Sequence, residues 1–213
     1  MKLKENVLVI IIASVVVGLT IFFALQIGGK NSQSKVNQQA NQSQGQSMAS
    51  HHGTGTVNSQ TFDNLVGKVA PGFTLKDSGG NSVSMDSLKG KKVVLFFNEG
   101  LMCYPACWNQ IVAFAQDKRF SDKNALVFSI IVDSKNNWQK ALQKMPELSL
   151  AKVLFDTDSS ASSSYGVLSL PSSMHLGTYP GHSYVIANER GIVTKVLDDP
   201  QMAIRNDEMI SSL

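Results

Sequence analysis

The pattern of hydrophobic and polar residues divides this chain into three regions. Residues 7–27 form an uninterrupted apolar stretch without a single charge. Residues 30–61 are rich in Ser, Gln, Asn and Gly and have few large apolar side chains. From Phe62 onward, short apolar runs alternate with helical patterns and turn residues. We therefore expect a membrane segment at 1–29, a flexible tether at 30–61 and a folded domain at 62–213.

Within the expected domain, two continuous apolar runs predict buried central strands. They are residues 93–97 and 125–132, and a shorter strand is expected at 153–155. Two hairpins are predicted, one from 69–75 and 83–85 around a Gly-rich turn, the other from 183–187 and 192–197. Asp86 is expected to cap a short turn between the first hairpin and the strand at 93–97.

Helices are expected between these strands, because their spacing and stop signals are helical. They cover residues 138–145, 159–165 and 201–213, and one more helix follows the run at 93–97. Strands that alternate with helices predict an α/β fold, a mixed central sheet covered by helices on both faces.

The apolar stretch at 7–27 is long enough to cross a membrane. A helix rises about 1.5 Å per residue, and the hydrocarbon core is about 30 Å thick. A cleaved signal peptide is the rival interpretation, but Ala24-Leu25-Gln26 is a poor cleavage site. We expect an uncleaved single-pass anchor in the cell membrane. The folded domain should then lie outside the cytoplasm, because a short N-terminal tail with lysines is easily retained inside.

The only two cysteines of the chain, Cys103 and Cys107, follow the buried run at 93–97. The residues after them repeat at helical spacing, so the thiols lie where a strand passes into a helix, and Pro105 fits the first turn of that helix. Unpaired N–H groups and the helix dipole lower a thiol pKa there. The C-x-x-x-C spacing lets the sulfurs form a disulfide or share an ion. A purely structural bridge is the alternative.

Composition narrows the possible partners. A formal net charge of +3 without a cluster of Lys and Arg argues against a nucleic-acid surface. Two cysteines are too few for a scaffold held together by disulfides.

Trp108 and Trp138 are expected to pack in the core. His51-His52 in the tether, Met174 and His175 are expected to carry no chemistry.

The order of elements resembles the thioredoxin fold and its redoxin (AhpC/TSA) branch, which includes peroxiredoxins and the Sco copper chaperones. The resemblance covers residues 66–197 and rests on VGKVAPGFTLKDSGGNSVSMDSLKGKKVVLFF, VFSIIVDS, FDTDSSASSSYGV and HSYVIANERGIV. It implies a thioredoxin-like domain whose chemistry, antioxidant or otherwise, depends on Cys103 and Cys107.

The peroxiredoxin pattern is incomplete in this chain. That family has a P-x-x-x-T-x-x-C motif, and aligning its cysteine with Cys107 places Gly100 at the Pro position and Tyr104 at the Thr position. The arginine expected ahead of Tyr184 is absent, since Gly181 and His182 stand there. The resemblance therefore implies a weakened peroxide-binding apparatus. In thioredoxins a cis-proline faces the cysteines, whereas here Pro180 precedes Gly181 at that place.

Two functions are compatible with this arrangement of cysteines and histidine. The leading prediction is a thiol-based oxidoreductase in which Cys103 and Cys107 are catalytic, with no cofactor and with a thiol/disulfide protein or other electron donor as partner. The alternative is a Sco-like chaperone in which Cys103, Cys107 and His182 bind Cu(I), a soft ion that suits thiolates and imidazole. His182 is required in the second function and optional in the first, and a third possibility leaves it a polar residue in a surface loop.

Overall fold

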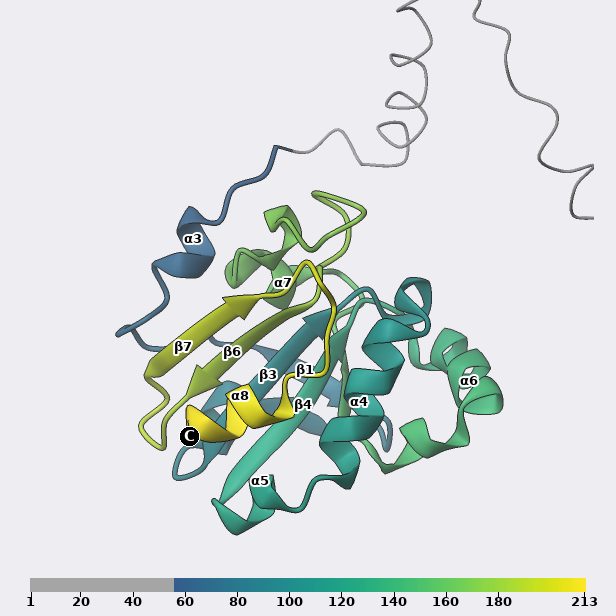
Figure 1. The fold of residues 1–213 in the computed structure, drawn as a ribbon, viewed down its shortest axis with the longest axis horizontal. Coiled ribbons are helices and arrows are strands. Elements are labelled where there is room, and N and C mark those ends of the chain that lie inside the picture. The colour runs from purple at the N-terminus through teal and green to yellow at the C-terminus, as the bar shows by residue number, and fades with distance from the viewer. Residues whose placement is uncertain (1–55) are drawn as a thin grey trace, which may run out of the picture. The chain divides into compact units, whose positions relative to one another are not determined.

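The computed structural model describes residues 56–213, and the predicted anchor and His51-His52 lie outside them. The strands form one seven-stranded sheet with the order β2-β1-β5-β4-β3-β6-β7, and Figure 1 shows β4, β3, β6 and β7 side by side in it. The strands are β1 Thr74–Asp77, β2 Ser82–Ser84, β3 Lys92–Asn98, β4 Ala125–Ile131, β5 Val153–Phe155, β6 Ser183–Ala187 and β7 Val193–Asp198. The predicted α/β fold with a mixed sheet is confirmed for this part of the chain.

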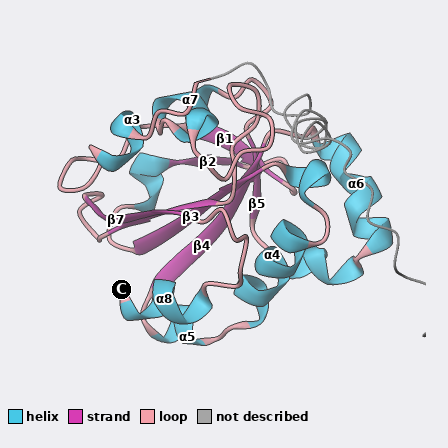
Figure 2. Ribbon diagram, turned by 45° about the horizontal axis from the view of Figure 1, so that its top comes forward, coloured by secondary structure: helices cyan, strands magenta, loops and turns pink. Residues whose placement is uncertain are grey.

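The helices lie on the two faces of the sheet (Figure 2). The α-helices are α3 Gln60–Asp63, α4 Ala106–Gln116, α5 Arg119–Asp122, α6 Lys135–Lys144, α7 Ser160–Ser164 and α8 Asn206–Ser211. Short 3-10 turns are η1 Met85–Leu88, η2 Gly100–Cys103, η3 Pro146–Leu150 and η4 Val167–Ser169. Among residues 56–213, none of the helices has the length and apolar character needed to span a membrane.

The central strand β3 pairs in parallel with β4 and antiparallel with β6. Successive side chains of a strand point to opposite faces, and Phe96 and Phe97 therefore belong to different cores. Phe97 packs with Tyr165 on the side of α3 and α7, while Phe96 packs on the side of α4 and α8. Trp108 and Trp138 are 3% and 1% exposed, which confirms them as packing residues.

Some predicted boundaries were wrong, because side-chain caps were not recognised in the sequence. The helix expected from Trp138 begins at Lys135, since Ser134 Oγ accepts the N–H of Asn137 at 3.2 Å. Ser84, and not Asp86, caps the turn η1. The closing helix begins at Asn206 rather than 201, because the preceding residues fold around the carboxylate of Asp199.

Candidate functional site

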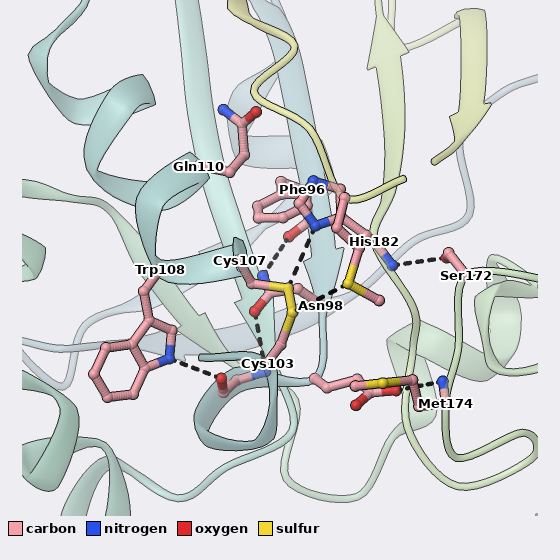
Figure 3. The surroundings of a disulfide bond; sticks show 12 residues. Phe96, Asn98, Cys103, Cys107, Trp108, Gln110, Ser172, Met174 and His182 are labelled. Atoms are coloured by element: carbon pink, nitrogen blue, oxygen red, sulfur yellow. Dashed lines mark hydrogen bonds between the residues drawn. A yellow bond between two sulfur atoms is a disulfide. The ribbon is translucent and has the colours of Figure 1, made fainter. Parts of the chain in front are cut away.

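Cys103 and Cys107 form a disulfide with a Cα–Cα distance of 5.4 Å (Figure 3). Cys103 ends η2, and Cys107 lies in the first turn of α4. Pro105 occupies the N-cap position of α4 and follows a cis peptide bond. Trp108 Nε1 donates a hydrogen bond of 2.9 Å to the carbonyl oxygen of Gly100, which ties the helix to the 3-10 turn. The structure thus joins the two sulfurs that the C-x-x-x-C spacing brought close.

The disulfide is buried, with its more accessible end at Cys103. Cys103 is 3% exposed and Cys107 is fully buried. The neighbours of Cys103 reach the surface, since Met102 is 56% and Tyr104 47% exposed. The thioether sulfur of Met202 lies 4.0 Å from Cys103 Sγ and covers it from the loop after β7. A partner would therefore approach from the Cys103 side.

His182 is buried against the disulfide, so its interpretation as a surface-loop residue is wrong. Its exposed fraction is 0%, and its Nδ1 lies 3.4 Å from Cys107 Sγ. The ring also packs edge-on against Phe96 at 4.6 Å between centroids. The antiparallel pairing of β6 with β3 explains this meeting, because it aligns Ser183, the residue after His182, with Phe97.

The environment of His182 keeps its imidazole neutral. Burial lowers the pKa of His182 to about 4, and the charge of Asp199 opposes this shift only in part. The side chain is held at its far end, where Nε2 lies 2.6 Å from the hydroxyl of Tyr184. Its backbone N–H donates to Ser172 Oγ at 2.7 Å. At neutral pH the ring nitrogen that faces Cys107 therefore belongs to an uncharged, fixed imidazole.

Gly181 has a steric reason to stand before His182. A Cβ atom there would collide with Ser172 Oγ and with the backbone of Ser173. A larger residue at this position would displace Ser172, which also donates its hydroxyl to Asp198. The close packing around the His182 backbone accounts for glycine at this position.

A second polar pair lies beside η2. The carboxylate of Glu99 is buried, accepts the N–H of Met174 at 2.8 Å and contacts His175 Nδ1 at 3.1 Å. Met174 and His175 do lie in a loop, as expected, but they hold this carboxylate next to the turn that carries Cys103. No periodic pattern along the chain indicates this contact.

Three potential metal-ligating residues come together in the site. Cys103, Cys107 and His182 each offer one ligand atom, and these atoms lie within 4.8 Å of one another. Soft sulfur donors with one imidazole suit Cu(I), once the disulfide is reduced. The structure thus brings together all the residues that the sequence singled out.

The family follows from comparison with known proteins. The model of the AhpC/TSA family matches residues 66–196. This chain belongs to the AhpC/TSA family. It is 32% identical over 139 residues to peroxiredoxin Q of Triticum aestivum, a match covering 62% of this chain and 58% of the relative. Peroxiredoxin Q of Sedum lineare is 33% identical over 139 residues, with 62% and 68% covered.

Solved structures support the fold of this AhpC/TSA chain. Peroxidoxin BcpB from Mycobacterium tuberculosis superposes with a TM-score of 0.57 at 20% identity, covering 69% of this chain and 94% of the other. The reduced 2-Cys peroxiredoxin of Plasmodium vivax gives a TM-score of 0.56 at 24% identity, with 68% and 78% covered. At these identities the likeness establishes the thioredoxin-like fold alone.

The residues at the family's Pro and Thr positions have other roles in this AhpC/TSA chain. Gly100 has a φ of +59°, and a Cβ there would collide with the carboxylate of Asp133. Tyr104 packs on Trp108, and Lys144 Nζ lies 3.5 Å from the centre of its ring. Gly100 has no side chain, and the Tyr104 ring is engaged by Trp108 and Lys144 instead.

Proposed function

We propose that this protein is a thiol-dependent oxidoreductase that cycles Cys103 and Cys107 between a disulfide and a dithiol. The observation that carries the proposal is the buried disulfide at the start of α4, with a neutral imidazole nitrogen 3.4 Å from Cys107 Sγ. Membership of the AhpC/TSA family supports thiol chemistry, and this chemistry requires no cofactor. The chain spans 58% of the length of the wheat relative, and its substrate is proposed from its own site.

We place the external reaction at Cys103, because it is the less buried residue of the pair and its neighbours Met102 and Tyr104 reach the surface. A partner thiolate attacks Cys103 Sγ, the bond to Cys107 breaks, and the Cys107 sulfur leaves with the electron pair and takes up a proton. A second partner thiolate then attacks the mixed disulfide and releases the Cys103 thiolate. Run in reverse, the same steps transfer two electrons from the dithiol to a partner disulfide.

Protein disulfides are the proposed substrate, with peroxide as the competing one. Peroxide would oxidise Cys107, the cysteine at the family's motif position, to a sulfenic acid, which Cys103 would condense to the disulfide with release of water. Gly100 and Tyr104 stand where the family's motif has Pro and Thr, so we expect slow reaction with peroxide.

The test is to mix the reduced full-length chain separately with a protein disulfide and with hydrogen peroxide and to follow closure of the Cys103–Cys107 bond by mass spectrometry. Faster closure with the protein disulfide supports the proposal. Fast closure with peroxide alone would replace it by a peroxidase, and failure of both would remove the oxidoreductase. Cys103→Ser serves as the control that cannot close.

Capture of Cu(I) is the second candidate, and the convergence of Cys103, Cys107 and His182 within 4.8 Å favours it. Copper would bind the reduced form, with the two thiolates and the imidazole as ligands. Replacing His182 with Ala should then weaken binding by about tenfold or more, or about 1.4 kcal/mol. An anaerobic titration against a Cu(I) chelator measures this. Affinity too weak to compete with the chelator would remove the candidate.

We also propose that residues 7–27 anchor the protein in the cell membrane, with the thioredoxin-like domain outside the cytoplasm. The support is the uncharged apolar stretch and its flanking lysines. Fractionation with N-terminal sequencing tests the anchor, and protease treatment of intact cells tests the side. A released form beginning near Gly28 would identify a signal peptide instead.

A further inference from the structure

A chain of hydrogen bonds runs from the active-site histidine into the interior of the protein. Tyr184, two residues after His182, lies on the same face of the chain as His182. Its hydroxyl lies 2.6 Å from His182 Nε2 and 3.1 Å from Gln110 Oε1. His182, Tyr184 and Gln110 are all fully buried. Figure 3 shows Gln110 on α4, on the same helix as Cys107.

The amide of Gln110 can adopt only one orientation. Its oxygen accepts the backbone N–H of Arg205 at 2.7 Å, and a backbone N–H can only donate. Its nitrogen donates to Asn206 Oδ1 at 2.9 Å. Asn206 is itself fixed, because its nitrogen donates to the backbone oxygen of Ala113 at 2.9 Å. A flip of Gln110 would place two donors face to face at Arg205, so Oε1 must face Tyr184.

This orientation determines the direction of the next two hydrogen bonds. The carbonyl oxygen of Gln110 has no proton, so the single hydroxyl proton of Tyr184 is donated to it. The oxygen of Tyr184 is then free to accept, and the atom opposite it, His182 Nε2, must carry a proton. The neutral ring has only one N–H, so Nδ1 presents its lone pair to Cys107.

We infer that Gln110 and Tyr184 are positioning residues that hold His182 in the tautomer with Nδ1 as a proton acceptor for Cys107. The opposite tautomer would direct the Tyr184 hydroxyl to His182 and leave it without a proton for Gln110. It would replace the two buried hydrogen bonds of the Tyr184 hydroxyl, with His182 and with Gln110, by one. Buried hydrogen bonds stabilise the arrangement that makes more of them, so the network favours the first tautomer.

The inference rests on the proposed function. The step that re-forms the Cys103–Cys107 disulfide needs such a proton acceptor. In the mixed disulfide between Cys103 and a partner, Cys107 Sγ attacks Cys103 Sγ while its proton passes to Nδ1. The bond to the partner sulfur breaks, and the partner leaves as a thiolate. The proton on the imidazolium then passes to that thiolate, so charge and electrons balance.

The tautomer can be measured directly. In the oxidised full-length chain with 15N-labelled histidine, the ring-nitrogen signals of His182 should show a protonated Nε2 and an unprotonated Nδ1. The His182→Gln variant identifies these signals by their loss. A proton on Nδ1, or an even mixture of tautomers, would overturn the inference.

Variants test the positioning role. Tyr184→Phe keeps the ring, which stacks on Phe96 at 4.8 Å, and removes the acceptor of the Nε2–H. Gln110→Met removes the acceptor that orients Tyr184. In both variants the His182 signals should move toward the Nδ1–H tautomer. Tyr165→Phe is the matched control, since it deletes a buried hydroxyl that donates to Pro71 on the other face of the sheet. It should leave the His182 signals unchanged.

The same variants connect the tautomer to the reaction. Disulfide closure from the mixed disulfide with glutathione should slow by about tenfold or more in Tyr184→Phe and Gln110→Met, and remain unchanged in Tyr165→Phe. Equal rates in all three would overturn the positioning role. A wild type that does not exchange at all would overturn the proposed function alone, because the nitrogen signals do not depend on turnover.

Discussion

His182 and Cys107 lie 75 residues apart in the sequence, yet Nδ1 of one is 3.4 Å from Sγ of the other. The contact joins the start of β6 to the first turn of α4 across the end of β3. Both side chains are fully buried, so it forms inside the core and not in an open cleft. Cys107 therefore has a proton acceptor beside it, whereas Cys103 has the thioether of Met202.

This difference predicts an asymmetry between the two cysteines. Cys107→Ser should form a stable mixed disulfide at Cys103 with a small disulfide reagent, because no second thiol can release it. Cys103→Ser should react more slowly by about tenfold or more, since the remaining Cys107 is fully buried and access limits exchange. Mass spectrometry of the adducts against time measures both. Equal labelling of the two variants would contradict the assignment of Cys103 as the outer thiol.

The buried His182 also predicts how stability depends on pH. Burial lowers its pKa to about 4, against an ordinary value of 6.5. Between these values the unfolded chain binds the proton and the folded chain does not, so the free energy of unfolding decreases as the pH falls. The contribution of His182 is complete above about pH 6.5. About 3 kcal/mol is lost by about pH 4.

Denaturant unfolding of the oxidised chain across this range, compared with His182→Asn, measures the effect. The variant removes the titrating group, so its free energy of unfolding should fall less steeply between about pH 6.5 and about pH 4. Carboxylates that titrate near the lower limit affect both proteins alike and cancel in the difference. Parallel curves for the two proteins would show that burial does not hold the imidazole neutral.

The central strands and the position of the two cysteines at a strand-to-helix junction could be predicted, because the sequence signals for both are local. The continuous apolar run at 93–97 marks a buried strand, and the thiols follow it directly. The position of His182 against Cys107 depends on the pairing of β6 with β3, which no local pattern specifies. The contact between Gln110 and Tyr184 could not be predicted for the same reason. Each residue fits a buried helix or strand, and only the packed structure shows that their polar atoms meet.

Met202 illustrates the same limit and leads to a further prediction. It lies in the loop wound around Asp199, with φ at +50°, and its sulfur covers Cys103 at 4.0 Å. Met202→Ala removes this cover and should speed reduction of the disulfide by dithiothreitol several-fold, since access governs attack on sulfur. Met174→Ala is the matched control, because its contact with Glu99 uses the backbone N–H. Equal acceleration by both variants would show that Met202 has no special role.

Gly100 gives the last prediction, since it holds the turn that carries Cys103. Its φ of +59° is in the left-handed region, where a side chain costs about 1–2 kcal/mol. An added Cβ would also collide with the Asp133 carboxylate, which accepts the N–H of Leu101 at 2.8 Å. Displacing that carboxylate breaks a further hydrogen bond, so Gly100→Ala should destabilise the fold by about 2–4 kcal/mol.

Gly80→Ala separates the two causes. Gly80 also has a positive φ, +85°, but a Cβ there would meet nothing within 4 Å. It should cost only the backbone term, about 1–2 kcal/mol, in the same denaturant experiment. Equal costs at the two positions would mean that Asp133 moves aside freely. A larger cost at Gly100 would measure the collision with Asp133. The proline of the family's motif is excluded there by the backbone alone, because its ring fixes φ near −65° and would unwind the turn that presents Cys103.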